Sequence, residues 1–231
     1  MFRGDSAELT DVLGRALGSA RDLGQPRAGS EHLLLALALD GPPARVLAEH
    51  GATAAKIRDA VTAAGPAGAG AAADRELLAV LGPGLDGLVH AAPLDRPAEP
   101  EPLFPLGAGR SRRNCARLNP PLGLDAQAVW AASLRLALAR RERQHRPEHL
   151  ALALVTLDPG AAWILRRTGA SRPALAASLA AAFPPPARHP LLRADRRLGR
   201  RARARDLVNR YQRTTGRTVT DGLSMAGLIV G

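Results

Sequence analysis

Aromatic residues and cysteine are scarce in this 231-residue sequence. Phe, Trp and Tyr together make up 3% of the chain, whereas hydrophobic residues as a whole make up 46%. A buried core must therefore be built mainly from alanine and leucine, which are strong helix formers, so the composition predicts an all-α fold. The single cysteine, Cys115, excludes an intrachain disulfide and a cysteine-based zinc cluster.

Long apolar runs are absent, and lysine occurs only once. No stretch approaches the roughly 18 apolar residues that a membrane span needs, and residues 1–10 lack the apolar segment of a signal peptide. We therefore expect a cytoplasmic protein. The only lysine, Lys56, follows no glycine-rich loop, so the sequence contains no Walker phosphate-binding motif with which to hydrolyse a nucleotide.

Basic residues outnumber acidic ones by 32 to 21, a formal net charge of +11. Most of this excess lies in residues 188–217, which contain eleven arginines and two aspartates, a net of +9. Such a segment could contact nucleic-acid phosphates in a salt-dependent way, although its only aromatic residue, Tyr211, offers little base stacking. The alternative is a solvated basic extension, or a helix that lies on an acidic face of the body or of a partner.

One sequence pattern occurs twice in the chain. Residues 31–39 read EHLLLALAL and residues 148–156 read EHLALALVT, an offset of 117 positions. The same offset, raised by one after an inserted residue, pairs further positions on either side: Leu17 with Leu134, Ala20 with Ala137, Gly51 with Gly169, Ile57 with Leu175 and Val61 with Leu179. We interpret the two units, each about 55 residues long, as an internal duplication.

Each unit is predicted to form four helices. In the first unit, apolar residues recur at spacings of three and four along a first helix that Ser6 or Asp5 can cap, and Ser30 can cap the next. Two more helices are expected, one ending at residue 50 and one over 53–64. In the second unit we expect helices over 125–142 and 148–157, another ending at residue 168, and a last one over 172–183.

The expected organisation is therefore two helical repeats, in residues 1–64 and 124–184. The connecting segment, residues 65–123, begins rich in glycine, alanine and proline, could form a short helical pair over 74–91, and then predicts an exposed proline- and arginine-rich linker. The basic C-terminal tail, residues 185–231, has an expected helix at about 195–213. Within the repeats, the apolar stripes predict burial of Leu33, Leu37, Ile57, Val61, Leu150, Leu154, Leu175 and Leu179.

The repeated segments resemble the Clp N-terminal domain, the double helical repeat that opens ClpA- and ClpC-type protein unfoldases. The resemblance rests on residues 30–37 and 45–51 in the first unit and on residues 147–150 and 164–169 in the second, and it covers about residues 5–183. It implies an all-α, pseudo-twofold domain that binds adaptors and substrates and performs no catalysis. The unfoldases add ATPase modules to this domain. We therefore expect a recognition domain standing alone, without a cofactor, that acts as an adaptor or a competitor in the Clp protease system.

Two glutamates, Glu31 and Glu148, lie in the first turn of the second helix of their units, where the helix dipole already favours a carboxylate. The resemblance implies a further role, because the glutamates of this signature in ClpC-type domains bind the guanidinium of phosphorylated arginine. A carboxylate suits this task, since it accepts paired hydrogen bonds. The hydroxyls of Ser6 and Ser30 could hold the phosphate in the first unit, whereas the second unit has no hydroxyl at these positions. We expect both carboxylates to be at least partly exposed.

The resemblance also implies a small-molecule surface. Natural-product antibiotics bind this domain in ClpC relatives on a surface that includes an N-terminal phenylalanine. Phe2 stands at that position here, whereas Leu122 replaces the phenylalanine of the second unit. A copy that stands alone could act as a decoy for such compounds.

A metal site is not expected. Residues 145–149 fit the H-x-x-E-H pattern of zinc proteases, but Pro147 at the helix start leaves His145 outside the helix, so the two histidines do not share a helical face. We interpret His32 and His149 as core residues that satisfy hydrogen bonds. The sequence thus predicts a non-enzymatic interaction module, with nucleic-acid binding through residues 188–217 as the alternative.

Overall fold

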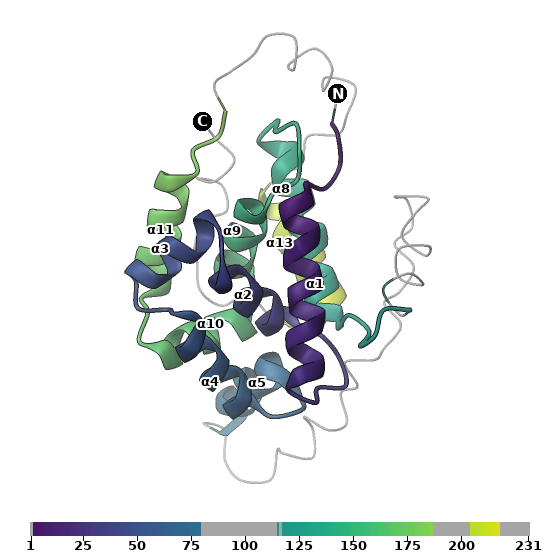
Figure 1. Cartoon of the computed structure of the whole chain (residues 1–231), viewed down its shortest axis with the longest axis vertical. Helices are drawn as coiled ribbons and strands as arrows, with labels where there is room; N and C mark the ends of the chain where they lie inside the picture. Colours follow the sequence, from purple (N-terminus) through teal and green to yellow (C-terminus); the bar gives the residue numbers. More distant parts are fainter. Residues whose placement is uncertain (1, 80–114, 116, 187–203, 218–231) are drawn as a thin grey trace.

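The computed structural model describes residues 2–79, 115, 117–186 and 204–217 (Figure 1). In these ranges the chain forms ten α-helices and no β-strand, so the predicted all-α class is confirmed. The first five are α1 (Ala7–Asp22), α2 (Ser30–Leu39), α3 (Pro42–Glu49), α4 (Ala54–Ala64) and α5 (Gly68–Ala79). The others are α8 (Leu124–Ala139), α9 (Pro147–Leu157), α10 (Pro159–Thr168), α11 (Arg172–Ala182) and α13 (Ala204–Thr215).

Local sequence signals set the helix ends. The Ser6 hydroxyl accepts from the backbone N–H of Leu9 and so caps α1, as expected. Prolines occupy the first turns of α3, α9, α10 and α11, where the missing N–H costs no helix hydrogen bond. Gly169, with φ of 82°, ends α10 in the left-handed conformation that glycine adopts without strain.

Two central helices, α2 and α9, form the middle of the core. Every residue of Ser30–Leu37 is buried, and in α9 every residue except Glu148 is buried. Around them, α1 packs against α2 and α8 against α9, while α4 packs against α2 and α11 against α9. Figure 1 shows α1 running lengthwise along one side of the body, with α3 and α11 on the opposite side.

The two groups of four helices correspond closely. Shifted by 117 positions, the bounds of α1 become those of α8, and the start of α2 becomes the start of α9. Two isolated β-bridges tie the groups together, one between Asp5 and His145 and the other between Ala28 and Leu122. The same shift turns Asp5 into position 122 and Ala28 into position 145, so it exchanges the two bridges.

Helix α5 differs from the expectation for its segment. The sequence rich in glycine and alanine suggested a connection, but α5 begins there, at Gly68, and packs against α10. The two backbones approach closely, because a Cβ on Gly160 would lie 2.9 Å from the backbone nitrogen of Gly70. Glu76 then fastens α5 to α10 by accepting from the indole N–H of Trp163 at 2.6 Å. Residues 80–114, the rest of the expected helical pair and most of the linker, lie outside the described residues.

Helix α13 comes from the basic tail. The expectation was a helix at about 195–213, of which residues 195–203 lie outside the described part; the structure has α13 up to Thr215. It packs on α8, and Leu207 and Tyr211 are each only 1% exposed. This part of the tail is therefore a component of the folded body and not a solvated extension.

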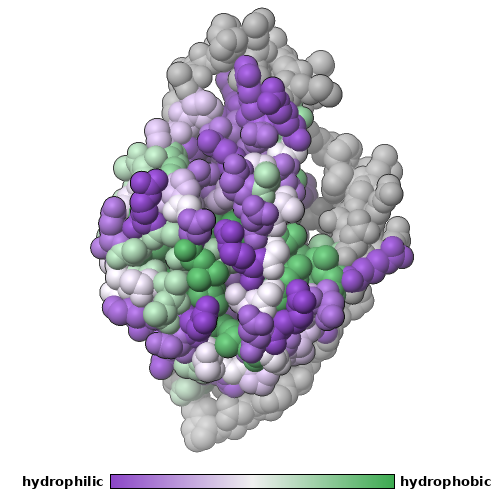
Figure 2. All heavy atoms as spheres, in the orientation of Figure 1, coloured by the Kyte–Doolittle hydropathy of each residue, from purple (hydrophilic) through white to green (hydrophobic). Residues whose placement is uncertain are grey.

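The apolar stripes behave as predicted. All eight leucine, isoleucine and valine residues expected to be buried are at most 1% exposed. Figure 2 shows a mainly hydrophilic face on which hydrophobic residues gather near the centre. Among the described residues, no helix has the length and apolar character to cross a bilayer.

A pair of substitutions in α2 tests how far the fold depends on this core. Leu37 is fully buried, whereas Leu39, two residues later, is 42% exposed. Leu37→Asp should unfold the protein, because an unpaired buried charge costs several kcal/mol against a total stability of about 5–15 kcal/mol. Leu39→Asp should change the free energy of unfolding by about 0.5 kcal/mol or less. Urea titrations followed by circular dichroism measure both, and equal effects would contradict this account.

Candidate functional site

The two signature glutamates hold matching positions, since each is the second residue of its helix. Their surroundings differ. Glu31 is 3% exposed, so the expectation of a partly exposed carboxylate is wrong for this residue. Glu148 is half-buried, with a side chain that is 13% exposed and an Oε2 that is buried.

Helix α5 accounts for the burial of Glu31. A Cβ on Gly29 would lie 2.4 Å from Glu31 Oε1, and one on Gly68 would lie 3.0 Å from it, so the carboxylate sits against two glycines. Burial opposes ionisation, but the backbone N–H groups of Glu31 and Ala69 favour the charged form, and the pKa of Glu31 lies below its ordinary value. Sequence patterns gave no sign of this enclosure, because α5 was not expected to start here.

The two signature histidines act as helix caps. The backbone N–H of Gly29 donates to Nδ1 of His32 at 3.1 Å, and that of Arg146 donates to Nδ1 of His149 at the same distance. Each ring thus satisfies an N–H group at the start of a buried helix. The interpretation of both histidines as core hydrogen-bonding residues is confirmed.

Ser30 has a different role from the expected one. Gly29 is the N-cap of α2, and Ser30 is its first residue. The Ser30 hydroxyl lies 2.8 Å from Asp158 Oδ1 and 3.1 Å from Asp125 Oδ2, and its backbone N–H also donates to Asp125. A hydroxyl has one proton, so it can hydrogen-bond to both carboxyls only when one of them is protonated.

Glu31, Asp125 and Asp158 form what we call the acidic cluster. Burial, together with the negative charges of Glu31 and Asp158, raises the pKa of Asp125 to about 6. Burial also raises the pKa of Asp158, against the opposing effect of its hydrogen bonds to Tyr211, Ala161 and Ser30. Ionising all three carboxyls of the cluster is therefore unfavourable in this buried position.

The C-terminal segment reaches this acidic cluster. The Tyr211 hydroxyl donates to Asp158 Oδ2 at 2.5 Å, and burial raises the pKa of this tyrosine well above its ordinary value. Arg217 is 7% exposed, and its Nε donates to Asp74 Oδ2 at 2.9 Å. Burial opposes the charge of Arg217, but Asp74, Asp125 and Asp158 raise its pKa.

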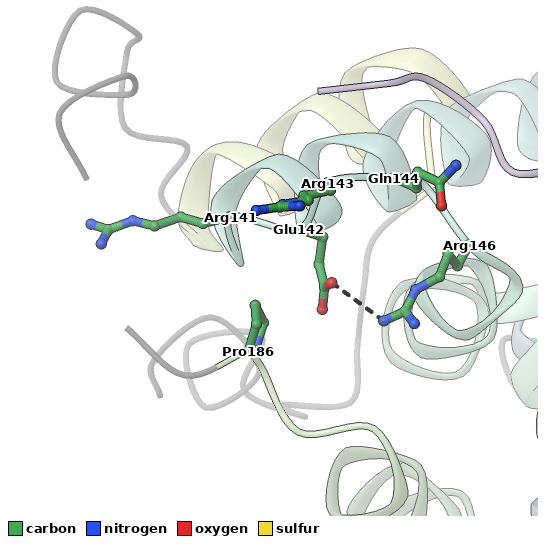
Figure 3. Close-up of a pocket in the computed structure, with 6 residues that line it drawn as sticks. All are labelled: Arg141, Glu142, Arg143, Gln144, Arg146 and Pro186. Atoms are coloured by element: carbon green, nitrogen blue, oxygen red, sulfur yellow. Dashed lines mark hydrogen bonds and ion pairs between the residues drawn. The ribbon is translucent and has the colours of Figure 1, made fainter. Parts of the chain in front are cut away.

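A second polar site lies at the start of α9. A hollow of about 250 Å³ is lined by Arg141, Glu142, Arg143, Gln144, Arg146 and Pro186. In Figure 3 the Arg146 guanidinium points at Glu142, the two being 3.3 Å apart, and Pro186 lies across from Glu142. Arg141, Arg143 and Arg146 line the hollow together with Glu142, and guanidinium groups can bind an anion.

Two carboxylates lie beside these arginines. Burial tends to raise the pKa of Glu142, but His149, Arg146 and Arg140 lower it below its ordinary value. Burial lowers the pKa of His149, which is therefore neutral at pH 7. Glu148 lies 3.9 Å from Arg146, and among the described residues its buried Oε2 has no hydrogen-bond partner.

Ser133, His145 and Asp5 are joined in the order of a serine-hydrolase triad, which sequence patterns did not reveal. Ser133 Oγ lies 2.8 Å from His145 Nε2, and His145 Nδ1 lies 2.7 Å from Asp5 Oδ1. Ser133 is in the interior of α8 and is fully buried, as is His145, so no substrate reaches the hydroxyl. We interpret this chain of hydrogen bonds as a link between the N-terminal segment and α8.

The remaining predicted residues are dispersed. Phe2 is half-buried. The Ser6 hydroxyl caps α1, and among the described residues no hydrogen bond or ion pair joins Ser6 to Glu31. His145 precedes α9, as the proline argument predicted. In the described ranges, no group of three or more His, Cys, Asp or Glu side chains is arranged to hold a metal ion.

Comparisons of the chain with protein-family models, with curated proteins and with solved structures found no match.

The raised pKa of Asp125 predicts a pH-dependent stability. Between its ordinary pKa of 3.8 and the folded value of about 6, the folded protein binds more protons at this site than the unfolded chain does. Stability contributed by this group therefore rises as the pH falls from 7 to 4, by about 2–3 kcal/mol. Asp125→Asn removes this titration. The free energy of unfolding of the parent minus that of the variant should therefore increase as the pH falls from 7 to 4. Urea midpoints at several pH values measure it, and a constant difference would contradict the assignment.

Proposed function

We propose that the two groups of four helices are a duplicated unit, and that the chain is a non-enzymatic protein-interaction module of the Clp N-terminal type. The observation that carries the proposal is the repeated Glu-His-Leu signature. In both copies the histidine caps a buried central helix, and in both the glutamate is the second residue of that helix. The matching helix bounds and the exchanged bridges support the duplication.

The proposed partners are substrates, adaptors or ligands of a ClpC-type unfoldase, which this module would deliver or compete for. The described part of the molecule offers a recess before the start of α9, lined by three arginines and Glu142, and Glu148 lies 3.9 Å from one of these arginines, Arg146. A ligand that carries a phosphate next to a guanidinium matches this pairing of charges. Phosphoarginine on a marked protein is such a group, and carboxylates and guanidinium groups recognise its two halves by charge-assisted hydrogen bonds.

The second unit is the better candidate for this ligand. The side chain of Glu148 is 13% exposed and lies 3.9 Å from Arg146. Glu31, the matching residue, is covered by the start of α5. The absence of a hydroxyl in the second unit is offset by Arg141, Arg143 and Arg146, any of which can donate to a phosphate.

Calorimetric titration with three versions of one peptide tests this site. A peptide containing phosphoarginine should bind, and versions with unmodified arginine or phosphoserine should bind at least about tenfold more weakly, because each lacks one of the two charges. Glu148→Ala should lower the affinity by a similar factor. Glu49→Ala, which removes an exposed glutamate at the end of α3, is the matched control and should have no effect.

Two results would count against the proposal. Equal binding of all three peptides, or none, would remove the phosphoarginine site. Failure of the purified chain to retain a ClpC-type unfoldase, its adaptors or its substrates from a lysate would remove the wider assignment to the Clp system. Salt-dependent retention of nucleic acid in place of these proteins would favour the alternative function of the basic tail.

A further inference from the structure

An arginine side chain from the tail is buried against carboxylates of the body. Arg217 lies two residues after α13, is 7% exposed and pairs with Asp74 at 2.9 Å. Its charge also interacts with Asp125 and Asp158. The hydroxyl of Tyr211, on α13, donates a hydrogen bond to Asp158.

The body supplies the acceptors of this site and the space for the guanidinium. The backbone N–H of Ser30 holds Asp125 at 3.1 Å, and the backbone N–H of Ala161 holds Asp158 at 2.5 Å. Gly70 leaves the space for the guanidinium, because a Cβ there would lie 2.2 Å from a terminal nitrogen of Arg217. Acceptors and space are therefore properties of α2, α5, α8 and α10, and the tail contributes the donors.

The site also has an acceptor that the tail does not use. Glu31 is 3% exposed, and it lies near enough to Asp125 to affect the ionisation of that residue. Within the described residues, Glu31 Oε2 is buried and has no hydrogen-bond partner. A guanidinium offers five N–H donors, more than a single pairing with Asp74 requires.

We propose that the acidic cluster and Asp74 form a binding site for an arginine of a partner polypeptide, which Arg217 and Tyr211 occupy in the closed state of this protein. The tail is then an intramolecular competitor. The apolar contacts of α13 are few, because it rests mainly on α8 and, of the apolar side chains that the structure describes there, Leu207 and Tyr211 are buried and Val208 is half-buried. A partner that brings an arginine and an apolar side chain replaces the same contacts.

This inference goes beyond the proposed function. It involves the acidic cluster, Asp74 and the tail, whereas the phosphoarginine site lies at Glu148, at the start of α9. The two are separable by experiment, because Glu148→Ala should leave binding at the acidic cluster unchanged.

Competition with a peptide copy of the tail provides the test. The probe is a fluorescein-labelled peptide with the sequence of residues 204–217, and the proteins are the full chain and its double variant Tyr211→Ala/Arg217→Ala. We expect the double variant to bind the probe at least tenfold more tightly than the parent, by fluorescence anisotropy. Arg213→Ala, at an exposed position of α13, is the matched control and should bind as weakly as the parent.

Two further arms identify the interaction. A probe in which the last arginine is replaced by alanine should bind the double variant at least tenfold more weakly than the original probe. Adding Asp74→Asn to the double variant should weaken binding of the original probe. A folded double variant with no gain in affinity, or equal binding of both probes, would overturn the proposal.

Hydrogen exchange on the parent protein keeps the test decisive if the double variant does not fold. Release of the tail requires the backbone N–H groups of α13 to exchange by local opening, well before those of the central helix α9. Exchange of α13 together with α9, only on global unfolding, would overturn the proposal.

Discussion

Two helices that are apolar on every side, α2 and α9, determine the architecture. A helix with a single apolar stripe needs one neighbour, but a helix buried all round must be surrounded. The chain supplies α1 and α4 around α2, and α8 and α11 around α9, and brings the two central helices into contact with each other. The short side chains of alanine and leucine let so many helices converge on one core with few aromatic residues.

This burial creates the polar chemistry of the molecule. The start of α2 is buried and the start of α9 is partly buried, so N–H groups in both first turns need partners from the protein. Histidine satisfies one such group in each helix, at Gly29 and Arg146. Asp125 accepts from Ser30 at the start of α2, and Asp158 accepts from Ala161 at the start of α10. Helix starts that meet in the interior thus gather carboxylates, and these carboxylates in turn attract the guanidinium of Arg217.

Local patterns were sufficient to predict the helices and their buried faces, but not the contacts between distant segments. The stripe and the cap at Ser6 placed α1 correctly, because both signals lie within a few residues of one another. The start of α5 was misjudged, since Gly70 looks like part of a linker until its neighbour Gly160 is known. The predicted exposure of Glu31 is wrong for the same reason, because the start of α5 covers this side chain. Arg217 and Asp74 are 143 positions apart, and no local period relates them.

The two units, similar in sequence pattern and in helix bounds, differ most at their signature glutamates. Around Glu31, the additional helix α5 covers the carboxylate and the tail places Arg217 on the neighbouring acids. Around Glu148, residues 140–146 contribute arginines that line a hollow, and the half-buried Glu148 lies 3.9 Å from one of them, Arg146. The first difference comes from α5 and the tail, which lie outside the two groups of four helices. The second comes from residues 140–146, whose sequence differs from that of residues 23–29 in the first unit. A shared core can therefore keep two helix starts in the same geometry while the surrounding segments make one of them a closed acidic site and the other an open basic one.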